Sequence, residues 1–145
     1  FQFDNNKAQV LNQNQLIKKD TLVSYEDMRY RCYIQVNPTT YKVIKATYND
    51  EGVEVDNVYH DNIVNLTIYT GANRLFARDF KKSDFKRFVP EDFLVQAILS
   101  DLTLYAVDKD GVHFNALLAM PDSPSYYVVD INVSPTGKLK MQLGK

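Results

Sequence analysis

Apolar and polar residues alternate along most of the chain from residue 21 to the C-terminus. In residues 29–36, for example, Tyr30, Cys32, Ile34 and Val36 occupy every second position. A period of two predicts a β-strand with one face on a hydrophobic core. By the same criterion, further strands are predicted at 41–48, 53–58, 63–70, 74–80, 102–107, 112–120, 126–133 and 138–143.

Turn-forming residues separate these predicted strands. Asn, Asp, Gly, Pro, Ser and Thr gather at 37–40, 49–52, 70–73, 108–111, 121–124 and 134–137. Such clusters are typical of turns, because their side chains compete with the backbone for hydrogen bonds or tolerate unusual dihedral angles. Since the intervals are short, the pattern favours antiparallel strands joined by hairpins.

One stretch departs from this rhythm. Ser83 is expected to cap a short helical turn that ends at Phe88. Pro90 is then expected to open a helix over 90–100, in which Phe93, Ala97 and Ile98 form an apolar stripe. We expect this stripe, together with Phe85 and Phe88, to pack on the sheet or to plug one end of a barrel.

These elements predict a mainly β fold: an antiparallel β-sandwich or open barrel of about eight to nine strands with one inserted helix near 90–100. The composition agrees, because Val, Ile, Thr, Tyr and Phe supply 48 of the 145 residues. A chain of this length corresponds to one domain. We expect residues 1–20, where Asn and Gln are abundant, to be a polar tether, and residues 21–145 to form a single β-rich domain.

Charge and hydropathy narrow the classes of partner. The formal net charge is −1 and the isoelectric point is about 6.1. Neither value favours nucleic acid, so no nucleic-acid partner is expected. No run approaches the roughly 20 apolar residues of a membrane-spanning helix.

The residues that usually carry chemistry are few and scattered. Cys32 lies on the apolar face of its predicted strand, so a buried, unreactive thiol is expected. His60 and His113 have no metal-ligand spacing, and nothing in the sequence brings Cys32, His60 and Asp61 together. The segment 108–111 has the Asp and Gly of a calcium loop but lacks its obligatory carboxylates. We therefore expect no catalytic residue, no metal and no cofactor.

One basic stretch could bind an anion or a partner. Six cations lie within residues 74–87, interleaved with phenylalanines and opposed only by Asp79 and Asp84. A strand-to-helix junction with a solvated charged face also explains this pattern, and the near-neutral chain offers no further basic elements. The candidate patch comprises Arg74, Arg78, Lys81, Lys82, Lys86 and Arg87.

The order of these segments also carries a resemblance. The chain runs from a Tyr-rich hairpin through RLFARDFKKSDF (74–85) and the helix to HFNA (113–116), then to YVVDINVS (127–134) and a closing GKLK (137–140). Over roughly residues 20–145, it resembles a family of uncharacterised lipoproteins, a domain-of-unknown-function family, from Bacteroides-type bacteria. The resemblance implies export to the cell envelope and a lipid-bearing cysteine upstream of Phe1. It implies no activity and no catalytic residues.

Two classes of function therefore stay open. The first is a non-catalytic envelope module that binds a protein, a peptide or a glycan, with exposed tyrosines as contacts. It would meet the membrane only through a lipid anchor outside this chain. The second is an enzyme of unfamiliar type that uses scattered Asp and His groups in a cleft. A concave pocket with converging, perturbed titratable groups would favour the enzyme.

Overall fold

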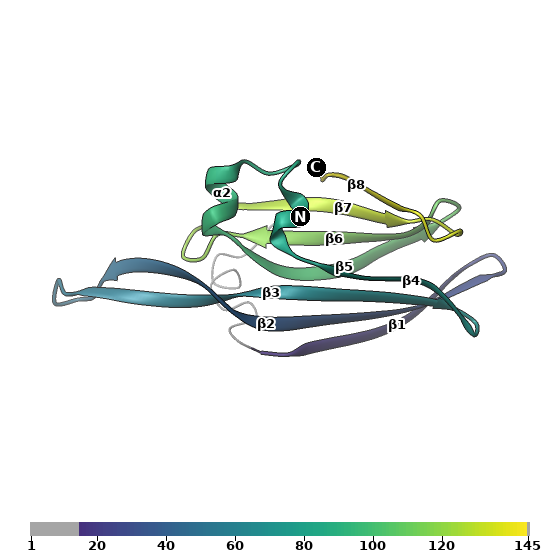
Figure 1. Ribbon diagram of the computed structural model, residues 1–145, viewed down its shortest axis with the longest axis horizontal. Coiled ribbons are helices and arrows are strands. Elements are labelled where there is room, and N and C mark those ends of the chain that lie inside the picture. The colour runs from purple at the N-terminus through teal and green to yellow at the C-terminus, as the bar shows by residue number, and fades with distance from the viewer. Residues whose placement is uncertain (1–14, 145) are drawn as a thin grey trace.

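Two four-stranded antiparallel sheets pack face to face in the computed structural model, which describes residues 15–144 (Figure 1). The first sheet has the order β1-β2-β3-β4 and the second β5-β6-β7-β8. The strands of the first sheet are β1 (Ile17–Tyr25), β2 (Met28–Tyr48), β3 (Glu54–Thr70) and β4 (Asn73–Phe80). Those of the second sheet are β5 (Ile98–Asp108), β6 (Gly111–Ala119), β7 (Tyr126–Val133) and β8 (Leu139–Leu143). The predicted β-sandwich class and the strand number are confirmed.

The core lies between the inner faces of the two sheets. Tyr30, Cys32, Ile34 and Val36 of β2 are all buried, as their alternation predicts. Phe114 and the other buried side chains of β6 and β7 face them from the second sheet. Since buried residues alternate with less buried ones along the middle of β2, β3, β6 and β7, one face of each sheet remains open to solvent.

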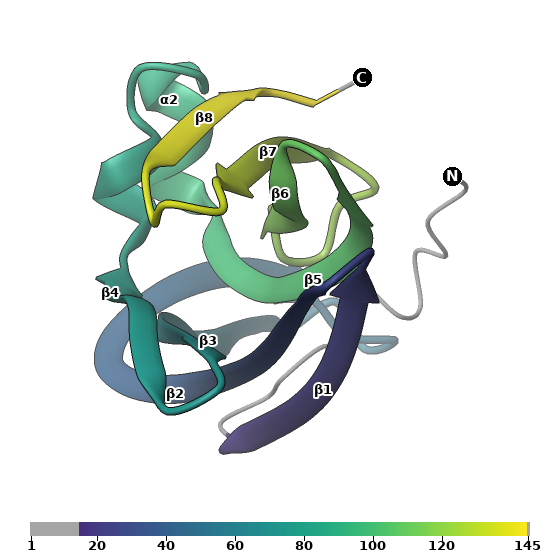
Figure 2. The ribbon, with the colours of Figure 1, turned by 90° about the vertical axis from the view of Figure 1, so that its right-hand side faces the viewer.

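The two sheets approach each other most closely where β3 lies over β5. At one margin, Lys19 of β1 forms an ion pair with Asp101 of β5 at 2.7 Å. At the opposite margin, the turn before β8 lies against β4. The approach is so close there that a Cβ atom added to Gly137 would lie only 2.5 Å from the carbonyl oxygen of Leu75. The end-on view shows both sheets strongly curled around the core (Figure 2).

The strands of the first sheet are longer than the sequence pattern predicts. The segment 37–40 is not a turn, because β2 runs without a break from Met28 to Tyr48. Its pairing with β3 shifts register between Pro38 and Lys42, which marks a β-bulge. A bulge tolerates proline because no ladder hydrogen bond is needed there. Likewise, the predicted strands at 53–58 and 63–70 are one strand, β3.

The first strand begins inside the predicted tether. Residues 17–20 belong to β1, which pairs with β2 from Ile17↔Val36 to Tyr25↔Met28. Residues 1–14 of the predicted tether lie outside the described residues. The pattern concealed β1 because Lys18, Lys19 and Asp20 interrupt its apolar positions.

The helical region is shorter than predicted. Residues Lys82–Phe85 form a 3₁₀ turn, η1. The carboxylate of Asp84 accepts a hydrogen bond from the backbone N–H of Lys81 at 2.8 Å, so the predicted cap, Ser83, does not cap this turn. The helix α2 (Glu91–Gln96) ends before Ile98, which begins β5 and pairs with Ala119 of β6. Residues 98–100 are therefore part of a strand, because pairing with β6 stabilises them more than continuation of the helix would.

The expected packing of the helix is confirmed. Phe93 of α2 is buried, and its ring lies edge-on to Tyr127 of β7 with centroids 4.7 Å apart. Ala97 and Phe85 are fully buried, and Phe88 packs against the same core. Helix α2 and η1 therefore cover the end of the second sheet (Figure 1).

Beyond the bulge, β2 and β3 continue as a two-stranded hairpin that we call the arm (residues 41–60). Neither β1 nor β4 pairs with it, since β1 reaches only Val36 and β4 only Val64. The arm projects past the end of the second sheet (Figure 1).

Candidate functional site

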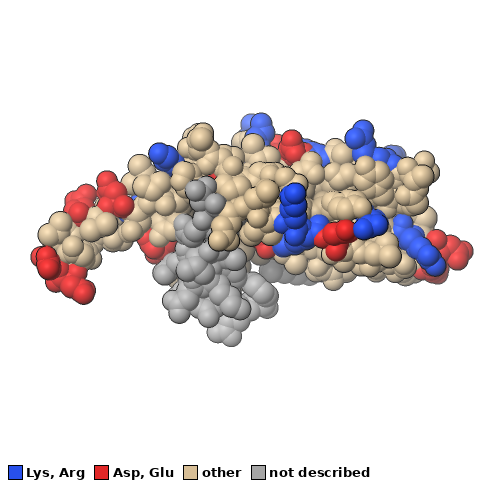
Figure 3. Space-filling model, turned by 90° about the horizontal axis from the view of Figure 1, so that it is seen from below, with Lys and Arg blue, Asp and Glu red and all other residues tan. Residues whose placement is uncertain are grey.

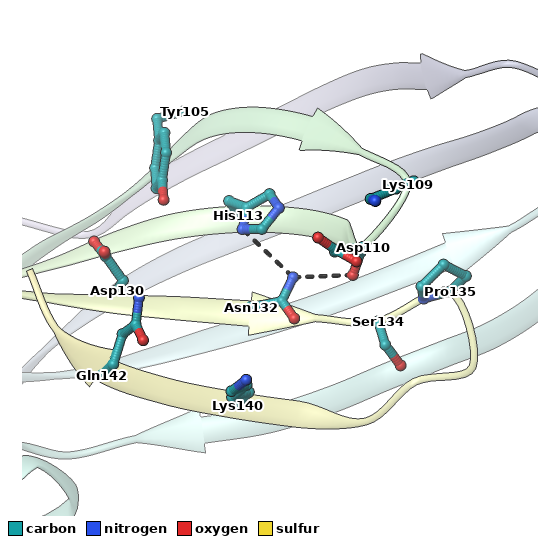
Figure 4. Close-up of a pocket in the computed structure, with 10 residues that line it drawn as sticks. All are labelled: Tyr105, Lys109, Asp110, His113, Asp130, Asn132, Ser134, Pro135, Lys140 and Gln142. Carbon is teal, nitrogen blue, oxygen red and sulfur yellow. Dashed lines mark hydrogen bonds between the residues drawn. The ribbon is translucent and has the colours of Figure 1, made fainter.

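A polar groove of about 470 Å³ lies on the solvent face of the second sheet. We call it the groove. Its lining comes from all four strands of that sheet and from two of the turns between them. The lining residues are Tyr105, Lys109, Asp110, His113, Asp130, Asn132, Ser134, Pro135, Lys140 and Gln142 (Figure 4).

Strand register brings the side chains of the groove together. Asn132 of β7 lies opposite His113 of β6 on one side and opposite Lys140 of β8 on the other. Asp130, two residues earlier on β7, lies opposite Gln142. Because residues two apart on a strand share a face, these polar groups all lie on the solvent side while Phe114 and Ile131 fill the core.

A β-bulge places the one tyrosine ring of the groove. The pairing of β5 with β6 shifts register between Leu104 and Ala106, so that Tyr105 is the extra residue. Its ring is half exposed and lies 5.9 Å from the imidazole of His113 between centroids. Bulges commonly redirect a side chain beside a functional site.

The imidazole of His113 has a partner on each nitrogen. Its Nε2–H donates to Oδ1 of Asp108 at 2.8 Å, while Nδ1 accepts a longer, 3.4 Å hydrogen bond from Nδ2 of Asn132. The amide of Asn132 also donates to the carbonyl oxygen of Asp110 at 3.1 Å (Figure 4). The neutral ring is therefore held in one tautomer and orientation.

Two pKa values near the groove are displaced. The hydrogen bond from His113, followed by that from the backbone N–H of Asp110, lowers the pKa of Asp108. Desolvation raises the pKa of Tyr105, and the carboxylates of Asp130 and Asp108 raise it further. The phenol of Tyr105 consequently stays protonated at neutral pH and can both donate and accept a hydrogen bond.

Several polar groups of the groove are free to meet a ligand. Within residues 15–144, the side chains of Asp130, Lys140 and Gln142 make no hydrogen bond or ion pair. The two lysines of the lining balance its two aspartates, so the groove carries no net charge when His113 is neutral. This balance suits a neutral polar ligand better than a highly charged one.

The geometry bears on the two open classes of function. The groove is concave and polar, and the pKa of Tyr105 is raised. Both features are expected of an enzyme's active site. However, a general base needs a nitrogen or carboxylate that can reach the proton it takes. Both nitrogens of His113 are engaged with protein groups, and the protonated Tyr105 is no base. The carboxylates of Asp110 and Asp130 remain open to a ligand in the groove, as hydrogen-bond acceptors or as bases.

The basic patch predicted from the sequence is distributed over several contacts. Arg78 forms an ion pair with Asp84 at 3.4 Å and lies over the ring of Phe80. Arg87 lies over the ring of Phe88. Arg74 lies opposite Tyr69 at the start of β4, and Lys81 precedes η1.

Two members of that patch, Lys82 and Lys86, line a second hollow of about 460 Å³ between the base of the arm and α2. Lys82 is half-buried there, with Nζ donating to the carbonyl oxygen of Ala97 at 2.9 Å. Desolvation lowers the pKa of Lys82, and the nearby carboxylate of Asp61 partly offsets this effect.

The structure also places the other candidate residues. Cys32 is buried, and desolvation raises its pKa to about 12, so the thiol is not a nucleophile at neutral pH. Cys32 lies opposite Ile68, whereas His60 lies opposite Lys42 beyond the bulge. Nδ1–H of His60 donates to the carbonyl oxygen of Thr39 at 2.9 Å. The structure therefore does not bring Cys32, His60 and Asp61 together as a catalytic set.

The described residues contain neither a cluster of metal ligands nor a membrane-spanning helix. Between residues 15 and 144, no three His, Cys, Asp or Glu side chains are grouped as ligands for a metal ion. None of the helices in that range has the length and apolar character needed to cross a membrane.

Sequence reasoning missed the groove. Of its lining residues, the sequence pattern indicates only His113 and the turn 108–111 as candidates for chemistry, each by itself. A usable signal was present, because Tyr105, Asp130, Asn132, Lys140 and Gln142 all occupy the polar positions of predicted strands. Their convergence depends on which strands are neighbours, and no local pattern reports that.

Comparison with known proteins identifies one family. A family model described as "Domain of unknown function (DUF4738)" matches residues 1–141. A search of curated proteins finds no match.

Proposed function

The chain belongs to the DUF4738 family of domains of unknown function, and on that premise we propose that it is a non-catalytic module of the bacterial cell envelope whose groove binds a neutral glycan. The observation that supports binding is the groove itself: free hydrogen-bonding groups beside one half-exposed aromatic ring.

The chemistry of the lining favours a glycan over a peptide. Sugar hydroxyls act as donors and acceptors at once, so they match the carboxylate of Asp130, the amide of Gln142 and the phenol of Tyr105. The flat ring of Tyr105 offers an apolar face against which the C–H face of a sugar can pack. A peptide that adds to a sheet needs a strand edge, but the groove lies across paired strands whose backbone groups already bond to each other.

The envelope location rests on the resemblance to lipoproteins and on the polar N-terminal stretch. It is tested by fractionating cells that produce the native precursor and by searching the membrane fraction for a lipid-modified N-terminal peptide. A precursor that stays in the cytosol without lipid would contradict this part of the proposal.

Binding is tested by NMR titration of the isotope-labelled protein with neutral oligosaccharides of gluco-, manno-, xylo- and galacto-configuration. Saturable shifts are expected on the solvent face of the second sheet for at least one of them. Tyr105→Ala should weaken that binding at least tenfold, because it removes both the ring and the phenol. Asp130→Asn should weaken it less, because one acceptor oxygen remains.

Tyr33→Ala is the matched control. Tyr33 lies on the solvent face of the first sheet, where it lines a separate hollow with Tyr69. If Tyr33→Ala abolished binding and Tyr105→Ala did not, the groove would be the wrong site. If no sugar of the panel shifted any resonance of the groove, the glycan would be the wrong ligand. The appearance of new sugar signals with time would show turnover and overturn the non-catalytic reading.

A further inference from the structure

The arm exposes apolar side chains to solvent. Of the eleven large hydrophobic residues that are exposed in the described chain, six lie on the arm or in its turn. They are Tyr41, Ile44, Tyr48, Val53, Val55 and Val58. A two-stranded hairpin without a core beneath it has little stability of its own. Register places Ile44 opposite Val58 on one face of the arm, whereas Val55 lies on the other face. Exposed apolar side chains gathered in this way typically mark an interaction site.

The far half of the arm is also acidic. Residues 46–58 contain Asp50, Glu51, Glu54 and Asp56 and no lysine or arginine. None of these four carboxylates forms an ion pair in the described part of the molecule. The space-filling view shows these acidic groups gathered at the end of the arm, away from most of the lysines and arginines (Figure 3).

A complementary surface lies on the same chain. The hollow between the base of the arm and α2, which we call the lysine hollow, combines apolar groups with two lysines and one carboxylate, that of Glu91. Its lining residues are Tyr41, Lys82, Ser83, Lys86, Glu91, Leu94 and Val95. Val95 is 66% exposed there, and Lys86 forms no ion pair among the described residues. An apolar floor with two ammonium groups suits an apolar segment that carries carboxylates.

The tip of the arm (residues 48–53) has this character. Tyr48 is 73% exposed and Val53 54% exposed, and Asp50 and Glu51 lie between them. The tip is thus an apolar and acidic projection, while the lysine hollow is an apolar and basic depression.

The tip cannot reach the lysine hollow of its own molecule. Tyr41 lines the hollow, and a strand rises about 3.3 Å per residue, so the turn at Asn49 lies roughly 26 Å away along the arm. The base of the arm is also held in place: the hydroxyl of Tyr59 donates to Asp122 at 2.7 Å. Nζ of Lys45 likewise donates to Oε1 of Gln96 in α2 at 2.7 Å.

We propose that the tip of the arm of one copy docks into the lysine hollow of a second copy of this chain. The tip and the lysine hollow are complementary in charge and in apolar surface, and these two parts of the chain cannot meet within one molecule. The contact joins two different surfaces, so it closes as a reciprocal pair or continues from copy to copy. It is independent of glycan binding, because the groove and the lysine hollow share no lining residue.

The association is tested by sedimentation equilibrium at about 10–500 µM protein, a range that detects contacts of micromolar affinity. In about 0.05 M salt, the average mass should rise above that of the monomer with concentration. It should fall back in about 0.5 M salt, where the screening length is well below 10 Å. The double variant Asp50→Lys with Glu51→Lys should raise the dissociation constant at least tenfold, and so should Lys86→Glu.

Two further samples make the test specific. A mixture of the double variant with Lys86→Glu should regain the higher mass, because the reversed tip then meets a reversed hollow. The matched control, Glu26→Lys with Asp27→Lys, makes the same charge change in the β1–β2 turn and should associate like the wild type. Circular dichroism checks that each variant is folded.

Three results would each overturn the proposal: a wild type that stays monomeric over the whole range, an equal loss of association in both double variants, or a mixture of folded variants that stays monomeric.

Discussion

Nε2 of His113 and Oδ1 of Asp108 lie 2.8 Å apart, joining β6 to the end of β5 at the edge of the groove. The same carboxylate oxygen accepts the backbone N–H of Asp110 at 2.8 Å. One carboxylate thus fixes the hairpin turn and the orientation of the imidazole at once.

This contact predicts how Asp108 titrates. Because the hydrogen bond from His113 is the main cause of its lowered pKa, the Asp108 carboxyl should titrate below its ordinary value near 3.8. The ionised Asp108 should contribute its full stabilisation at pH values above the pKa that this carboxyl has in the unfolded chain. That stabilisation should be lost as the pH falls through the lower pKa of the carboxyl in the folded protein. In the variant His113→Ala, the midpoint should move up toward 3.8. Carbon-detected NMR of the Asp108 side-chain carboxyl measures this titration midpoint in both proteins.

His60→Ala serves as the control, because His60 contacts Thr39 and not the groove. An Asp108 midpoint that is the same in the wild type and in His113→Ala would show that the hydrogen bond does not exist in solution.

A second prediction concerns the buried carboxyl of Asp61. Its Oδ1 accepts the backbone N–H groups of Leu99 and Asn62, both at 2.8 Å, and so ties β3 to β5. Desolvation nevertheless raises its pKa, which means that the folded protein binds this proton more tightly than the unfolded chain. Relative to Asp61→Asn, the wild type should therefore become more stable as the pH falls from the folded-state pKa of Asp61 to its ordinary value of 3.8. Below that pH, its stability relative to Asp61→Asn should not rise further.

Two variants separate charge from hydrogen bonding at Asp61. Asp61→Asn keeps an acceptor oxygen for both N–H groups, whereas Asp61→Ala leaves them unpaired and should cost about 2–4 kcal/mol at neutral pH. Chemical denaturation from pH 4 to 8 measures the free energy of unfolding of the wild type and of both variants. Parallel pH profiles for wild type and Asp61→Asn would contradict the raised pKa.

A third prediction concerns the attachment of α2. Phe93 is only 8% exposed and packs edge-on against Tyr127. Phe93→Ala should lower the free energy of unfolding by about 3–5 kcal/mol, the usual cost of emptying a site of this kind. Equilibrium denaturation measures the change.

Val95→Ala, two residues along the same helix, is the control. Its side chain is 66% exposed, so the free energy of unfolding should change by less than about 0.5 kcal/mol. A Phe93→Ala variant as stable as Val95→Ala would mean that α2 is not docked on the second sheet in solution.

Local patterns in the sequence determined the fold class. The burial of alternate residues in β2, including Cys32, follows from a period of two that any core-facing strand must show. The hairpin turns at 49–52, 70–73 and 108–111 also lie where their residues predict them. The apolar stripe around Phe93 predicted which face of the helix is buried, although α2 is shorter than expected. Each of these features depends on residues close together in the chain.

Only the tertiary structure decided where strands join and which side chains meet. Pro38 looks like part of a turn, but β2 passes through it because β3 supplies a partner for the bulge: the carbonyl oxygen of Asp61 accepts the hydroxyl of Thr39 at 2.8 Å. The groove likewise needs the register of four strands and a bulge at Tyr105. The physical reason is that alternation assigns a residue to a face, whereas pairing between distant strands assigns it a neighbour, and a binding site is made of neighbours.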